Sequence, residues 1–145
     1  MAAERSYWLV KTEPGAYSWQ DLLDEGTTPW DGVRNYQARN NLRAMKKGDL
    51  VLVYHSVGPR DVVGVTKVTR EAYPDPTTDD DRWDAVDLKA VKSVKTPVTL
   101  KQIKADELLH DVALVKHSRL SVMPLMRDEF ERILELGETT LPKRI

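Results

Sequence analysis

A set of polar and aromatic residues could do chemistry, and one of them, Trp30, stands where no helix or strand face requires it. They are Lys11, Glu13, Pro14, Trp30, Tyr54, His55 and Ser56. An indole such as Trp30 can stack on a flat heterocycle, which contributes about 1–3 kcal/mol for a nucleic-acid base. The set resembles the lining of a pocket for such a ring. Trp30 could equally be a plug in the core, and Tyr54 could be ordinary strand packing.

Residues 32–48 form a segment without any carboxylate that carries five cationic side chains and three asparagines. The cations are Arg34, Arg39, Arg43, Lys46 and Lys47. Residues 112–126 are a second acid-free segment with Lys116, His117 and Arg119, although the whole chain has a net charge of −1. A local cationic face on an acidic body favours a small anionic ligand over a long polyanion. Solvated surface charge is the alternative interpretation.

Composition excludes several kinds of chemistry. The chain has no cysteine, so disulfides, thiolate metal sites and thiol nucleophiles are absent. Its three histidines show no zinc-ligand spacing, and Asp79–Asp81 lack the pattern of a calcium loop. No phosphate-binding loop or nucleophile elbow occurs. We therefore expect no metal and no cofactor.

Length and hydropathy predict a single domain over residues 1–145. No run of about 18 apolar residues could span a membrane, and the first ten residues lack the apolar part of a secretory signal. We expect a cytoplasmic monomer.

Periodicity and capping patterns predict short helices around an antiparallel sheet. Ser18 with Asp21, and Thr99 with Gln102, match capping boxes. Gly64 indicates a bulge or a close backbone approach, and the alternation slips at Ala90–Val91. Trp30 falls in a loop. We expect strands at 7–11, 49–56, 61–73 and 85–94, and helices at 19–24, 35–46, within 100–106 and from 126 to 137. The fold class is α+β: a bent, partly closed antiparallel β-barrel with short peripheral helices.

Several motifs in order resemble the EVE domain family. They are "YWLVKTEPGAYSWQDL", "WDGVRNYQARNNLRAMKKGDLVLVYHS", "GVTKV", "VDLKAV" and "ALVKHSRLSVMPL", within about residues 6–136. The resemblance implies a PUA-like fold and binding of nucleic acid, DNA or RNA, that carries a modified base such as methylated or hydroxymethylated cytosine. The base would flip into a pocket between the 35–46 helix and the barrel. The long basic extension of eukaryotic members is missing, so we expect a bacterial protein.

The resemblance also implies which residues form the site. The base-binding residues would be Lys11, Glu13, Pro14, Trp30, Asn35, Tyr36, Asn40, Tyr54, His55, Ser56, Ser118, Arg119, Leu120, Ser121 and Val122, and the phosphate-binding residues would be Arg34, Arg39 and Arg43. Asparagine is a poor helix former. We interpret Asn35 and Asn40 as amides directed at the pocket and Asn41 as structural, although Asn35 could simply cap its helix.

Two other functions remain open. Lys11 and Glu13 could serve a hydrolase that acts on small nucleoside-like molecules, as ASCH-type enzymes do, with the amine activating a nucleophile and the carboxylate transferring protons. Alternatively, the amphipathic C-terminal helix could dock a partner in an interaction module. The first possibility predicts turnover of a modified nucleoside, and the second predicts association without nucleic acid.

Overall fold

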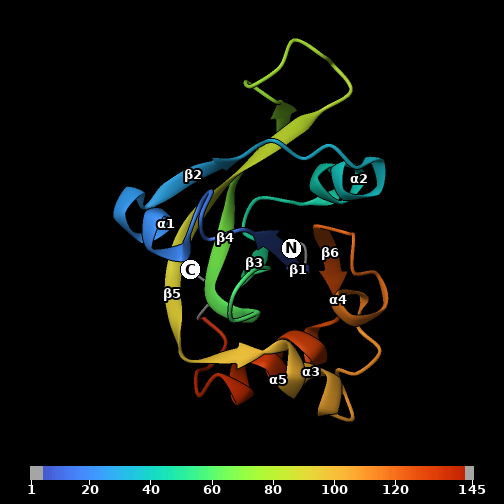
Figure 1. Ribbon diagram of the computed structural model, residues 1–145. Coiled ribbons are helices and arrows are strands. Elements are labelled where there is room, and N and C mark those ends of the chain that lie inside the picture. The colour runs from blue at the N-terminus through green and yellow to red at the C-terminus, as the bar shows by residue number, and fades with distance from the viewer. Residues whose placement is uncertain (1–4, 143–145) are drawn as a thin grey trace.

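The computed structural model describes residues 5–142 and contains one six-stranded sheet with short helices around it (Figure 1). The strands are β1 (Tyr7–Thr12), β2 (Thr27–Trp30), β3 (Leu50–His55), β4 (Asp61–Pro74), β5 (Asp84–Thr99) and β6 (Val122–Leu125). The helices are α1 (Trp19–Glu25), α2 (Tyr36–Ala44), α3 (Leu100–Ala105), α4 (Ala113–Lys116) and α5 (Arg127–Leu136). The predicted α+β class with short helices at the rim is confirmed.

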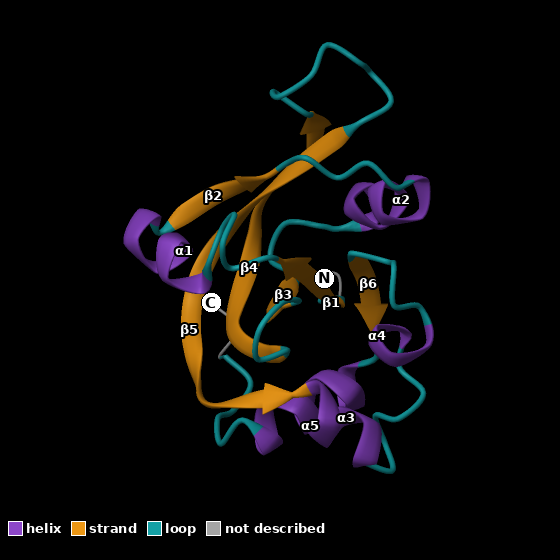
Figure 2. Ribbon diagram, in the orientation of Figure 1, coloured by secondary structure: helices purple, strands orange, loops and turns teal. Residues whose placement is uncertain are grey.

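The sheet is mixed rather than wholly antiparallel. Its order is β2-β5-β4-β3-β1-β6, and β1 pairs with β3 in parallel while the other neighbours are antiparallel. β1 and β3 can run in parallel because the long segment between them crosses over through α1, β2 and α2. The sheet is not closed, and β2 and β6 are its edges. β4 and β5 are long and curve around the other strands (Figure 2).

Trp30 belongs to an edge strand, which corrects the prediction that it lies in a loop. In β2, Thr27 is opposite Lys89 of β5 and Trp30 is opposite Val86. The strand is only four residues long and contains Pro29. Proline has no N–H to donate, so a strand that contains it is tolerated at a sheet edge. This pairing fixes the backbone of Trp30.

Both predicted irregularities of the sheet occur. The β4–β5 register shifts beside Gly64, and it shifts again where Val65 is opposite Lys92 but Thr66 is opposite Ala90. The second shift leaves Val91 as the extra residue of a bulge. Gly64 also meets the ring of Trp19 so closely that a Cβ at this position would lie 2.2 Å from a ring carbon. The glycine is therefore required for packing.

The helices begin where the capping signals predicted. Ser18 and Thr99 form capping boxes at the starts of α1 and α3. α2 is shorter than the predicted 35–46, because Asn35 lies outside it as the N-cap and Met45 has extended backbone angles. The apolar stripe of α5 is buried in the core, with Phe130 centred 5.0 Å from the ring of Tyr7. That stripe therefore offers no free docking face.

No helix within residues 5–142 has the length and apolarity needed to cross a membrane.

Candidate functional site

A cavity of about 550 Å³ opens beside Trp30. Its walls come from the end of β1, the turn after it, the last residue of α1, β2, the segment that follows β2, and one residue before β6. The lining residues are Lys11, Thr12, Ala16, Tyr17, Glu25, Thr28, Pro29, Trp30, Asp31, Gly32, Val33, Arg34 and Ser121. Cavities that hold small ligands in proteins have volumes of about 300–1,000 Å³. This cavity is large enough for one heterocyclic ring system.

Trp30 is both part of the core and part of the cavity wall. Only 8% of the residue is exposed, yet it lines the cavity. The ring of Tyr17 meets it edge-on, with the centroids 6.3 Å apart and the planes at 83°. The Tyr17 hydroxyl is buried and has no hydrogen-bond partner among the described residues. Burial raises the pKa of this hydroxyl, which lies near the side chains of Thr28 and Glu25, so the group is neutral at physiological pH.

Cationic and anionic groups face the cavity from different walls. Lys11 Nζ donates a hydrogen bond of 2.8 Å to the carbonyl of Ser118, and burial lowers the pKa of the Lys11 amine. Asp31 directly follows Trp30 in the sequence and also lines the cavity. Burial, together with the negative charge of Asp75, raises the pKa of the Asp31 carboxyl. The cavity thus combines apolar ring surface with a few polar groups, which is the usual make-up of a small-molecule site.

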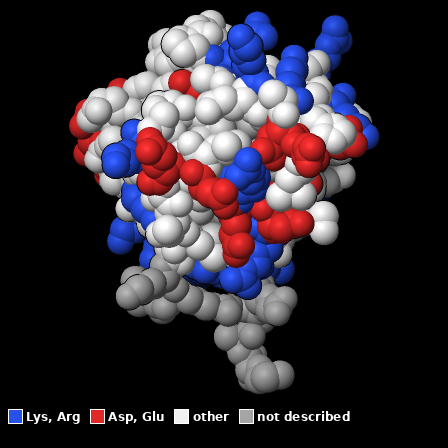
Figure 3. Space-filling model, turned by 90° about the horizontal axis from the view of Figure 1, so that it is seen from below, with Lys and Arg blue, Asp and Glu red and all other residues white. Residues whose placement is uncertain are grey.

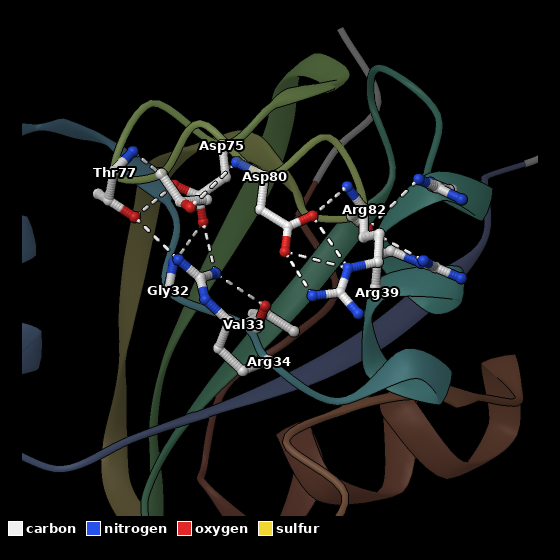
Figure 4. Close-up of polar contacts among 10 residues, drawn as sticks. Gly32, Val33, Arg34, Arg39, Asp75, Thr77, Asp80 and Arg82 are labelled. Carbon is white, nitrogen blue, oxygen red and sulfur yellow. Dashed lines mark hydrogen bonds and ion pairs between the residues drawn. The ribbon is translucent and has the colours of Figure 1, made fainter.

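Asp75, from the loop between β4 and β5, holds the rim of the cavity in place (Figure 4). Its buried carboxylate accepts hydrogen bonds from Gly32 N–H at 2.8 Å, Arg34 Nη1 at 3.0 Å and Thr77 N–H at 2.7 Å. Burial alone would raise its pKa, but the hydrogen bonds from Thr77, Gly32 and Arg34 lower the pKa of Asp75 to about 2. The carboxylate is therefore ionised at neutral pH.

A second cavity of about 470 Å³ adjoins the first and shares Lys11, Thr12 and Ser121 with it. Glu13, Tyr54, Ser56 and Ser118 also line it, as do Arg60, Leu100 and Leu114. The structure thus brings together Lys11, Glu13, Trp30, Tyr54, Ser56, Ser118 and Ser121, as well as Arg34, around two neighbouring cavities.

Other predicted site residues lie elsewhere. Asn35 Oδ1 accepts the N–H of Ala38 and caps α2, and Asn40 Oδ1 accepts from Arg39. No residue of α2 lines either cavity, so neither is the predicted pocket between this helix and the barrel. Asn41 Nδ2 donates a hydrogen bond of 2.7 Å to the carbonyl of Val122, and this bond connects α2 to β6.

The rest of the predicted set has structural partners or surface positions. His55 Nε2 accepts the N–H of Trp19, while Leu120 and Val122 are buried in the core. Pro14 is half-buried outside both linings, and Arg119 is exposed. The guanidinium of Arg43 is ion-paired with Asp84 at 2.6 Å.

Sequence reasoning missed Tyr17, Asp31 and Asp75. Tyr17 lies beside the capping residue Ser18 in a turn-rich stretch, which was its only local signal. Asp75 stands between two prolines in an acidic loop and looks like a solvated residue. Only the docking of this loop onto residues 32–34 makes it part of the rim.

Among residues 5–142, no cluster of three or more His, Asp or Glu side chains is arranged to hold a metal ion.

The face formed by α3 and α5 carries many Asp and Glu side chains among its Lys and Arg side chains (Figure 3). Such a face disfavours a polyanion. The acid-free residues 32–48 lie at the end of the molecule that contains α2 (Figure 1), where Asp75 and Asp84 pair with two of their arginines.

The sequence and fold match one family over nearly the whole chain. A family model described as EVE domain matches residues 6–136. Mouse thymocyte nuclear protein 1 is 38% identical over an alignment 168 residues long, gaps included, which covers 92% of this chain and 74% of that protein.

Solved structures of related proteins also match the sequence and fold of this chain. The crystal structure of a protein from Agrobacterium tumefaciens is 44% identical, with a TM-score of 0.92 and coverage of 94% of this chain and 96% of that one. Human THYN1 in complex with 5-methylcytosine-containing DNA is 35% identical, with a TM-score of 0.84 and coverage of 94% and 99%.

Proposed function

This chain belongs to the EVE domain family, and on that premise we propose that it binds nucleic acid that carries a modified base. The base would leave its stack and enter the cavity beside Trp30. The observation that carries the proposal is this cavity, whose wall combines an indole with a carboxylate, an amine and a guanidinium. The human relative crystallised with DNA containing 5-methylcytosine supports the choice of ligand class.

The lining suggests a role for each group. Trp30 and Tyr17 would contact the ring of the base. Asp31 could accept a hydrogen bond from the exocyclic amine of cytosine, as acidic side chains do when they read this base.

The cations would bind the backbone of the nucleic acid. Arg34 lines the cavity and is 41% exposed at its side chain, so a phosphate at the rim could reach it. Lys11 lies between the two cavities and could contact a phosphate or sugar in the second one. Backbone contacts of this kind position a nucleic acid without reading its sequence.

Titration of labelled oligonucleotides tests this proposal. The probes carry one 5-methylcytosine, one 5-hydroxymethylcytosine or one plain cytosine, as single and double strands of DNA and RNA. We expect tighter binding of a modified probe than of its plain counterpart, and weaker binding of all probes as salt increases. Asp31→Asn should weaken binding of all three kinds of probe, because the exocyclic amine is common to them, while Lys104→Gln, on α3, should change nothing. Equal binding of modified and plain probes would refute the proposed base selectivity.

A hydrolase is the second candidate because Lys11 and Glu13 line the same cavity, and burial lowers the pKa of the Lys11 amine. A lowered pKa increases the fraction of the neutral amine, which is the form that can act as a base or nucleophile. Incubation of the protein with modified nucleosides, followed by mass detection of products, tests this function. Product formed by the wild type and lost in Lys11→Met would support it.

A further inference from the structure

An aromatic and arginine cluster lies just outside the cavity, where α2 begins and the β4–β5 loop ends. The ring of Tyr36 stacks on that of Trp83, with centroids 5.1 Å apart and planes at 28°. Trp83 is only 8% exposed, whereas Tyr36 is 51% exposed. Tyr36 is therefore an exposed aromatic ring with a fixed backing.

Hydrogen bonds hold Tyr36 in this position. Arg82 Nη1 donates to the Tyr36 hydroxyl at 2.9 Å, and Arg82 itself is paired with Asp80 at 2.5 Å (Figure 4). A side chain that is already immobilised loses little conformational entropy when it binds a ligand. The ring is thus prepared for stacking.

Arg39 differs from the other arginines of this region. Arg34, Arg43 and Arg82 each pair with an aspartate. Within the described part of the chain, Arg39 has no carboxylate at ion-pair distance, and its guanidinium donates instead to the carbonyl of Arg82 and to Asn40 Oδ1.

The guanidinium of Arg39 lies 5.0 Å from the centroid of the Tyr36 ring. An uncompensated guanidinium beside an exposed aromatic ring matches one phosphate beside one base.

The cluster continues from the rim of the cavity. Arg34, which lines the cavity, has its guanidinium carbon 5.6 Å from the Trp83 ring centroid. Asp79 and Asp81 are exposed in the same loop, and their negative charges would oppose a second phosphate on that side. The cluster therefore suits a single nucleotide next to the cavity.

We propose that Tyr36 and Arg39 bind the nucleotide adjacent to the one whose base enters the Trp30 cavity. The neighbouring base, unpaired, stacks on Tyr36, and its phosphate lies at Arg39. This inference rests on the proposed function, because it places a second nucleotide of the same strand. It assigns a stacking platform outside the base cavity, with Trp83 and Arg82 as its support.

Removal of the neighbouring base, combined with removal of the Tyr36 ring, tests the contact. The probes are single-stranded DNA with one 5-methylcytosine, and the same DNA with an abasic site on its 5′ or its 3′ side. We expect the abasic site on one side to weaken binding to the wild type by about 5- to 150-fold, the range for one base–aromatic stack. Tyr36→Ala should weaken binding of the intact probe by a similar factor and remove the effect of the abasic site. Tyr36→Phe should retain most of that effect.

Arg39→Gln tests the phosphate contact through salt dependence. We expect the slope of log affinity against log salt to become shallower by about 0.7, as for one phosphate contact on a single strand. Lys104→Gln removes the same charge from α3 and should leave the slope unchanged.

The outcomes separate this inference from the function on which it rests. If the wild type binds the 5-methylcytosine probe but neither abasic site matters and Tyr36→Ala binds normally, only the adjacent-nucleotide contact is refuted. If the wild type binds no probe, the proposed function fails and this inference fails with it.

Discussion

Asp75 and Arg34 are forty-one residues apart in the chain, yet the buried carboxylate lies 3.0 Å from the guanidinium at the rim of the candidate cavity. The same carboxylate accepts the N–H of Gly32. The loop between β4 and β5 therefore determines the shape of a site whose other residues come mostly from the first third of the sequence.

Replacement of Asp75 should lower the stability of the folded protein, and the size of this effect should depend on pH. Folding lowers the pKa of this carboxyl to about 2, so it stabilises the protein above pH 4, and this contribution is lost as the pH falls towards 2. We expect Asp75→Asn to lower the free energy of unfolding by roughly 2 kcal/mol at pH 7. Urea unfolding between pH 7 and pH 2.5 measures the difference, which should shrink on acidification. A difference that is constant with pH would contradict this account, and Asp24→Asn, at an exposed position, serves as the control.

Gly64→Ala should destabilise the fold because Trp19 occupies the space that a methyl group needs. The new Cβ would lie 2.2 Å from the ring, so strand or ring must move. Overpacking of a core typically costs about 1–3 kcal/mol. Thermal or urea unfolding should show that the free energy of unfolding falls by an amount at the upper end of this range. Gly15→Ala is the matched control, since a Cβ at Gly15 meets nothing within 4 Å, and an equal loss there would show that packing is not the cause.

Tyr17→Phe should separate stability from binding. The hydroxyl is buried without a described partner, so its removal should leave the free energy of unfolding unchanged or raise it by up to about 1 kcal/mol. Because the hydroxyl is buried away from the cavity and phenylalanine keeps the ring, affinity for the 5-methylcytosine probe should stay unchanged. Urea unfolding and oligonucleotide titration measure the two effects. A clear loss of stability would indicate that the hydroxyl already has a partner in the free protein.

The three asparagines near α2 should respond differently to alanine. Asn35→Ala removes the N-cap and should cost about 1 kcal/mol. Asn41→Ala removes the bond to Val122 and should cost about the same, even though alanine is the better helix former. Asn40 is exposed, and within residues 5–142 its side chain bonds only to Arg39, so Asn40→Ala should be neutral or slightly stabilising. Unfolding free energies of the three variants test this order, and a destabilising Asn40→Ala would overturn it.

Elements that depend on near neighbours could be predicted from the sequence. The capping boxes at Ser18 and Thr99 lie where they were predicted, because a cap involves residues three positions apart. The bulge at Val91 was visible because side chains alternate along a strand and an extra residue interrupts the alternation, and the irregularity at Gly64 was visible because a glycine inside a strand is itself a signal. The EVE domain motifs pointed to the fold class, which the relatives confirm.

The candidate site was predicted only in part. Trp30 and Lys11 stood out by residue type, and both line the cavity. The asparagines of α2 stood out for the same reason, but their amides serve a helix cap, a neighbouring arginine and a strand. Residue type shows what a side chain can do, and it does not show which partner the side chain meets.

By itself, the sequence determined the short-range structure and the chemical inventory: where helices begin, where strands are irregular, and which cations and rings are available. Only the tertiary structure decided that residues 27–30 form an edge strand, that β1 and β3 run in parallel, and that Asp75 closes the rim beside Trp30. These features depend on pairs of residues about forty to sixty positions apart. Their meeting depends on the packing of the whole chain, so no local pattern encodes it.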